Sequence, residues 1–166
     1  PSDIVILGRA RTNFDNCREE LENRGILVSV ARKKSFYDAL EIKTIVDLLK
    51  TVDNPHQDIP LVGVMLSPIG KFDENDLGRI RMADHDGDFY DALLSYQEHG
   101  AEGETLNKVR DFLSMLSRFR SLSQRKSVHD LLWTIYLETG YYLFASGMPE
   151  GENRKMNLDL LLEESV

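Results

Sequence analysis

Residues 36–61 read FYDALEIKTIVDLLKTVDNPHQDIPL, and this stretch decides how the rest of the chain is interpreted. Apolar residues recur at positions 42, 45, 46, 48, 49 and 52, which is the spacing of one helix face. We place this helix at 40–52, because Pro55 disfavours helical geometry in the residue before it. A second, short helix is expected at 58–66, since its proline falls in the first turn, where no N–H is needed.

The composition limits the class of protein. A chain of 166 residues with 42% hydrophobic side chains suits one domain, or one domain with part of another. No apolar run approaches the roughly 20 residues of a membrane span, and the first residues lack a signal-peptide pattern. The single cysteine excludes a disulfide framework and a cysteine metal cluster. We therefore expect a soluble, cytoplasmic protein without a membrane partner.

The charge is unevenly distributed. Residues 1–56 carry 9 basic and 9 acidic side chains, whereas residues 57–166 carry 11 and 19, so the net charge of −8 falls in the second part. A strong non-specific binder of nucleic acid is usually basic. Any contact with nucleic acid should therefore be local, and the acidic part should face solvent or a protein.

The first residues predict a small β-α-β piece. The apolar run 4–7 and the run 26–30 are typical of buried strands, and helix formers occupy 12–23 between them, followed by a glycine cap. Two strands and one helix cannot cover both faces of a sheet. We therefore expect this piece to belong to a larger domain, and the chain to be a fragment.

Helical patterns dominate everything after residue 38. Further helices are expected after a cap at Asp73 and at 89–97, 105–124, 128–139 and 153–164. The predicted fold class is thus mainly α with a small N-terminal β-α-β piece.

Catalytic motifs are missing from the sequence. It contains no Gly-x-x-x-x-Gly-Lys-Ser/Thr phosphate loop, and we can place no nuclease constellation. The aspartates at 84–88 alternate as in a calcium loop, but Phe89 and Ser95 stand where such a loop needs glycine and glutamate. We expect no catalytic residue, metal site or cofactor here, and interpret 84–88 as a solvated acidic turn.

Arg9 and Arg11 follow the first predicted strand directly. In α/β proteins this position commonly contacts a ligand, and arginine can pair with phosphate through two hydrogen bonds. The residues alone favour a phosphate contact and a solvated surface about equally.

The turn Ser67-Pro68-Ile69-Gly70-Lys71 is the second candidate for phosphate binding. A glycine-containing turn before a helix can expose backbone N–H groups, and Lys71 adds a positive charge. Arg79 and Arg81 on the next helix could extend it. A plain turn would contain the same residue types.

Trp133 could be a stacking platform for single-stranded bases. It clusters at helical spacing with Leu132, Ile135 and Tyr136 in an acidic region. We therefore favour a place in the core over a stacking platform.

Several strings resemble one family, the UvrD-type superfamily 1 DNA helicases, and within it the AddA (RexA) subunit of bacterial helicase–nucleases. DIVILGRA at 3–10 and FYDALEIK at 36–43 resemble the general helicase pattern. The AddA branch is indicated by DNPHQDIPL at 53–61, MLSPIG at 65–70, and the segments 89–93, 127–142 and 147–151. Leu66 and Lys71 depart from that pattern, which has arginine and a small residue there.

The resemblance implies a division of the chain. Residues 1–35 would end the second RecA-like motor domain, and residues 36–166 would begin its helical accessory (2B-like) domain. Arg9 would contact the tracking single strand, and residues 67–71 the duplex ahead of a fork or end. The parent would use ATP and Mg²⁺ as a 3′→5′ helicase and exonuclease in double-strand break repair and recombination, and its partner would be an AddB/RexB-type subunit.

Two alternatives stay open. The chain could be the accessory domain of a plain UvrD-type helicase, which lacks a nuclease. It could also be a helical protein-interaction module without a role on DNA, as the net charge of −8 would allow.

Overall fold

The computed structural model describes residues 6, 14–26, 28 and 36–165, and the chain divides into two compact units, 1–34 and 35–166. In the first unit, α1 (Phe14–Glu22) lies within the helix predicted at 12–23. The strands predicted at 4–7 and 26–30 fall largely outside the described residues. The three described positions within them, Ile6, Ile26 and Val28, are not in strands. The β-α-β piece therefore stays a prediction.

All regular secondary structure described in the second unit is helical. Its elements are η2 (Phe36–Asp38), α2 (Leu40–Asp53), α3 (Asp58–Met65), α4 (Glu74–Arg81), α5 (Phe89–His99), α6 (Glu104–Ser123), α7 (Val128–Thr139), α8 (Tyr141–Ser146) and α9 (Gly151–Glu163). The predicted mainly helical class is confirmed. None of the described helices combines the length and the apolar character needed to cross a membrane.

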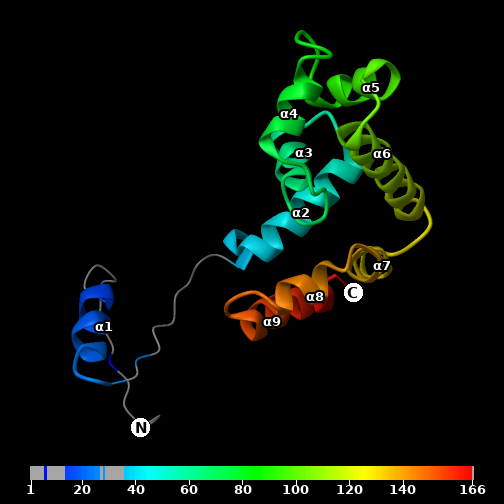
Figure 1. Ribbon diagram of the computed structural model, residues 1–166. Coiled ribbons are helices and arrows are strands. Elements are labelled where there is room, and N and C mark those ends of the chain that lie inside the picture. Colours follow the sequence, from blue (N-terminus) through cyan, green and yellow to red (C-terminus); the bar gives the residue numbers. More distant parts are fainter. Residues whose placement is uncertain (1–5, 7–13, 27, 29–35, 166) are drawn as a thin grey trace. The chain divides into compact units, whose positions relative to one another are not determined.

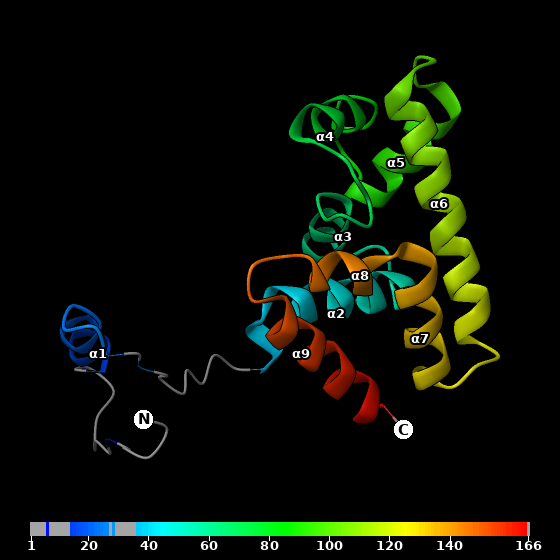
Figure 2. The ribbon, with the colours of Figure 1, turned by 60° about the horizontal axis from the view of Figure 1, so that its bottom comes forward.

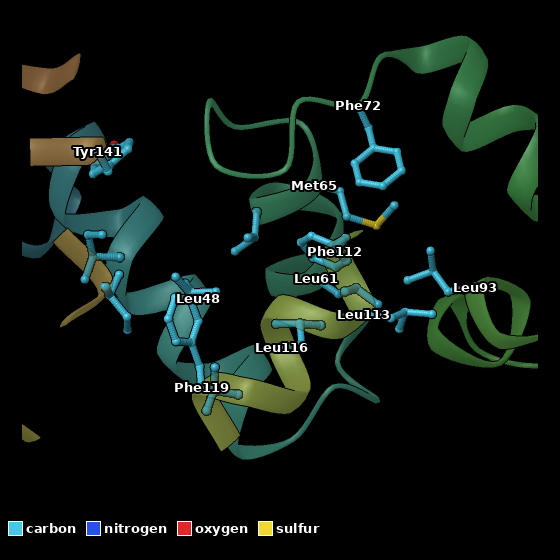
Figure 3. Packing of buried hydrophobic residues seen from close by; sticks show 14 of the residues in the cluster. Leu48, Leu61, Met65, Phe72, Leu93, Phe112, Leu113, Leu116, Phe119 and Tyr141 are labelled. Atoms are coloured by element: carbon cyan, nitrogen blue, oxygen red, sulfur yellow. The ribbon is translucent and has the colours of Figure 1, made fainter. Parts of the chain in front are cut away.

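Helix α2 occupies the middle of this unit. Figure 1 shows α3 to α5 on one side of it and α7 to α9 on the other, and α2 contacts α3, α6 and α9 directly. Ile42, Ile45 and Leu48 are completely buried, because the apolar stripe predicted from the sequence is covered by those neighbours. In Figure 3, Leu48 lies beside Phe119 of α6.

An ion pair between the buried Glu41 and the partly buried Arg154 joins the two ends of the unit. Glu41, in the first turn of α2, accepts a hydrogen bond from Arg154 Nη1 at 2.6 Å and from Asn157 Nδ2 at 2.7 Å, both on α9. Because a buried carboxylate without partners is costly, these contacts fix where α9 packs. The sequence separation exceeds 110 residues, so no local pattern could reveal this contact.

Helix α6 packs against α2. Its stripe of apolar residues from Leu106 to Phe119 is buried, as its spacing predicts. Arg120 Nε donates to the Val52 carbonyl at 3.0 Å. The guanidinium thus satisfies a carbonyl in the last turn of α2, where the helix dipole favours a positive charge.

Two expectations about the last 40 residues need correction. Helix α8 was not expected, since its six residues are too few for a periodic pattern; the left-handed Gly140 separates it from α7. Trp133 does not lie in the core, because 46% of its surface is exposed, whereas Leu132, Ile135 and Tyr136 are buried. The prediction put the tryptophan on the wrong side of α7.

Replacing Arg154 with methionine should lower the free energy of unfolding by about 3 kcal/mol, as expected when one partner of a buried ion pair is removed. Urea denaturation would measure the loss. Lys43→Met is the matched control, since Lys43 is exposed on α2 and its side chain has no partner within the described chain. Equal effects of the two substitutions would show that the Glu41–Arg154 pair does not hold α9 in place.

Candidate nucleic-acid interface

Arg9 and Arg11 lie outside the residues that the structure describes. Their predicted phosphate contacts therefore stay predictions. The turn at residues 67–71, in contrast, is described completely and follows α3.

Ser67 organises the start of this turn. Its hydroxyl donates to the Val64 carbonyl at 2.6 Å and accepts from the Ile69 N–H at 3.2 Å. Ser67 itself is buried, so its side chain is a structural part of the turn.

Two backbone hydrogen bonds close the turn onto α3. The Lys71 N–H donates to the Ser67 carbonyl at 2.9 Å, and the Phe72 N–H donates to the Met65 carbonyl at 3.0 Å. The Phe72 ring then packs edge-to-face on Phe112 of α6, with ring centroids 5.6 Å apart. Figure 3 shows the Phe72 side chain pointing from the turn toward Met65.

The expectation that this turn exposes several backbone N–H groups is therefore wrong for Ile69 and Lys71. Both groups are bonded inside the turn. Pro68 has no N–H, and Gly70 retains the one N–H of residues 67–71 without a hydrogen bond. A phosphate could meet a single backbone donor here, together with the Lys71 ammonium.

Lys71 has a backbone conformation that is uncommon for a residue other than glycine. Its φ of 61° lies in the left-handed region that favours glycine, and its side chain is exposed. The turn holds this residue in a strained conformation, and within the described chain its ammonium has no ion pair. The positive charge is free to meet an anion.

The helix after the turn is anchored by a buried carboxylate. Asp76 and Asp73 form a reciprocal capping box at the start of α4. Asp76, only 4% exposed, also accepts from Thr105 Oγ1 at 2.6 Å and from Lys108 Nζ at 2.9 Å, both on α6. Burial alone raises the pKa of Asp76, but the hydrogen bonds from Thr105, Lys108 and the Asp73 N–H outweigh it and lower that pKa.

The arginines of α4 are already engaged. Arg79 Nη1 donates to Thr105 Oγ1 at 3.0 Å, and Arg81 Nη1 donates to the Gly87 carbonyl at 2.7 Å. Three acidic residues, Asp73, Glu74 and Asp76, follow Lys71 closely in the chain. The turn therefore carries a small, isolated positive charge and no broad basic patch.

The acidic turn at 84–88 is held by hydrogen bonds within itself. Asp84 Oδ1 accepts from the N–H groups of Asp86 and Gly87, at 3.0 and 3.1 Å. No sequence pattern indicated that His56 would meet this region, 32 residues away from Asp88. His56 Nδ1 lies 2.5 Å from Asp88 Oδ2, and one ligand atom each from His56, Asp88 and Asp91 lies within 4.8 Å of the others.

That group has a structural role on α5. Asp88 Oδ1 accepts from the Asp91 N–H at 2.9 Å as the helix cap. Asp58 Oδ1, at the start of α3, accepts from the Phe89 N–H at 2.9 Å. The Asp58–Phe89 hydrogen bond and the His56–Asp88 contact together fasten the α2–α3 connection to the start of α5.

Comparison with known proteins gives consistent results. Residues 1–95 match the model of the UvrD-like helicase C-terminal domain. Proteins named as the A subunit of an ATP-dependent helicase/nuclease are 41% identical over 163 residues in Listeria monocytogenes and 40% identical over 167 residues in Geobacillus kaustophilus. A third, from Lysinibacillus sphaericus, is 40% identical over 168 residues.

These alignments cover 98–99% of this chain and 13–14% of each relative. The chain therefore spans about one eighth of the length of the curated relatives that it matches.

Gly70→Ala should destabilise the fold by about 2 kcal/mol, because the new Cβ would clash with the Met65 carbonyl oxygen. Gly78→Ala, inside α4, is the control, since nothing lies within 4 Å of its Cβ. It should stabilise the helix by about 0.5–1 kcal/mol. Thermal denaturation of both variants measures the difference, and a neutral Gly70→Ala would contradict the closed geometry of the turn.

Stability should also depend on Asp76 in acid. Because its folded-state pKa is lowered, the ionised Asp76 contributes stability that is complete above the ordinary carboxyl pKa and is lost as the pH falls through the folded-state pKa. Asp76→Asn should reduce stability at pH 7 and make the loss below about pH 4 shallower. Urea titrations at several pH values test this, with exposed Asp111→Asn as control; parallel pH curves for wild type and Asp76→Asn would refute it.

Proposed function

The chain belongs to the UvrD-like helicase C-terminal domain family, and from that membership we propose that it is a DNA-contacting part of an AddA/RexA-type helicase–nuclease subunit. The observation that carries the proposal is the roughly 40% identity to the A subunits of ATP-dependent helicase/nucleases along nearly the whole chain. A plain UvrD-type helicase is disfavoured by the same observation.

In this proposal residues 1–35 end the second motor domain and residues 36–166 begin the helical accessory domain. The helical second unit supports an accessory, non-catalytic role. The sequence contains no phosphate loop to hold ATP and Mg²⁺, so we assign no residue of this chain to either. Nucleotide hydrolysis, 3′→5′ translocation and exonuclease activity would belong to other parts of the parent.

The parent would process double-strand breaks for recombinational repair together with an AddB/RexB-type subunit. The contribution of this chain would be to hold DNA. Arg9 and Arg11 would contact the single strand, and the turn at 67–71 would meet duplex DNA ahead of a fork or end through Gly70 and Lys71, with Ser67 and Ile69 shaping the turn. The free Lys71 ammonium and the unbonded Gly70 N–H support this assignment.

The departures from the AddA pattern have a structural meaning. Leu66, where the pattern has arginine, is 47% exposed next to the turn. An arginine side chain could reach a phosphate from there. Lys71 stands five residues later, at a position where the pattern has a small residue. In this chain the positive charge is therefore at residue 71 and not at residue 66.

Lys71→Gln should weaken binding to forked DNA and reduce the slope of log K against log salt by about 1, because one phosphate contact is lost. Leu66→Arg should do the reverse and add about 1 to that slope. Fluorescence anisotropy of a labelled fork, measured at several salt concentrations, gives both values.

Met82→Arg is the control for Leu66→Arg. Met82 is 74% exposed at the end of α4, so the same charge is added away from the turn. If Met82→Arg and Leu66→Arg strengthen binding equally, only net charge matters and the turn is not a DNA site. No salt-dependent binding by the wild-type chain would favour the protein-interaction alternative.

A further inference from the structure

A second surface, formed by the end of α6 and by α7, has features that the proposed function does not use. Residues 112–129 contain four Arg or Lys residues and no Asp or Glu. This stretch thus carries +4 in a chain of net charge −8, which leaves −12 for all other residues. The second unit has a negative net charge as a whole but contains this basic segment.

This segment comprises the second half of α6, the connection at 124–127 and the start of α7. In Figure 2 the chain reverses after α6 and returns as α7 beside the end of α6, and the two helices are in contact. Arg118, Arg125 and Lys126 are exposed there. Arg120 is not part of the surface, because it is half-buried and bonded to the Val52 carbonyl.

Trp133 lies next to residues of α7 that these basic groups reach. Lys126 Nζ donates to Thr134 Oγ1 at 3.1 Å, one position after Trp133 in the chain. Arg118 Nη2 donates to Glu138 Oε1 at 2.7 Å, one turn further along. The exposed Leu137 follows Trp133 by one turn and extends its apolar face. We call Arg118, Arg125, Lys126 and Trp133 the α6–α7 surface.

Two carboxylates face these cations. Glu138 pairs with Arg118, and Asp130 lies on α7 one turn before Thr134. The Arg118–Glu138 pair is exposed, and such pairs contribute little to stability, so a phosphate can replace the carboxylate. Lys126 keeps two of its three donors, and the Arg125 guanidinium has no partner in the described chain. The cations remain available to an anion.

We propose that the α6–α7 surface binds single-stranded nucleic acid, with phosphates on Arg118, Arg125 and Lys126 and a base stacked on Trp133. An exposed indole on the helix that two of the exposed cations reach matches a ligand that alternates flat apolar rings with negative charges. An acidic protein segment would use the cations but would not need the aromatic face.

This inference rests on the proposed function, because both require the chain to bind DNA. It places a contact with single-stranded DNA on the second unit, at a site separate from the turn at 67–71. Phe72, which follows that turn, packs on Phe112 of α6, and Arg125 comes thirteen residues later, just after the end of that helix. At 1.5 Å per residue, the two sites are about 20 Å apart along the helix.

Trp133 is the single tryptophan of the chain, so its fluorescence reports this surface alone. Adding a short oligothymidylate to the full 166-residue chain should quench the emission, because a base stacks on the indole. Trp133→Ala should weaken binding about tenfold, measured by anisotropy of the labelled oligonucleotide. Binding without quenching would overturn the proposal.

The triple variant Arg118→Gln/Arg125→Gln/Lys126→Gln should reduce the salt slope for single-stranded DNA by about 2, at roughly 0.7 per phosphate. Its matched control is Lys43→Gln/Arg110→Gln/Lys155→Gln, which removes three exposed charges elsewhere. Equal effects of the two triples would overturn the proposal. So would equally good displacement of the oligonucleotide by polyglutamate of the same charge, which would indicate an acidic protein ligand.

Lys71→Gln separates the two ideas. If Lys71→Gln weakens fork binding while the α6–α7 triple leaves single-strand binding unchanged, this inference fails and the proposed function stands. If the triple alone has an effect, the surface stands and the turn at 67–71 loses its assignment. A wild-type chain that binds no DNA at low salt would end both.

Discussion

The enclosure of α2 is the constraint on which the second unit depends. Its apolar stripe is covered by α3, α6 and α9, which come from positions far apart in the chain. Glu41 ties its first turn to Arg154, and Arg120 satisfies the Val52 carbonyl near its last turn. Since both ends are fixed by charged groups, the helices that carry the two proposed DNA contacts are held on one central element. Burial of this stripe is therefore the condition for either surface to exist.

The sequence predicted those elements whose signals are local. Helix α7 begins and ends where Ser127 and Gly140 indicate, and the Asp73 cap marks the start of α4, because caps and glycine stops act within a few residues. It missed α8, whose six residues show no period. It also misplaced Trp133, since the apolar residues at 131–133 and 135–137 are spread around α7 and do not reveal which apolar side faces its neighbours.

The candidate site was harder to predict than the fold. A turn was predicted at Ser67, Ile69, Gly70 and Lys71, and the structure has a turn there. Most of the backbone N–H groups that were expected to be free are instead hydrogen-bonded within the turn. The hydrogen-bond partner of the Ile69 and Lys71 N–H groups is Ser67, and this pairing depends on backbone geometry, which residue types do not specify. The networks around Asp76 and His56 join residues about 30 positions apart, so spacing rules could not detect them. The phosphate contacts of Arg9 and Arg11 remain predictions from the sequence.

The closed turn before α4 has a consequence for how it would meet DNA. Its hydroxyl and three of its N–H groups are already satisfied within the protein, and the Phe72 ring is locked on Phe112. A rigid loop loses little conformational entropy when a ligand arrives. Binding of the turn to a DNA backbone would then be the association of two rigid shapes. Sliding along successive phosphates would require no rearrangement of the turn, a property suited to a component past which DNA continuously moves.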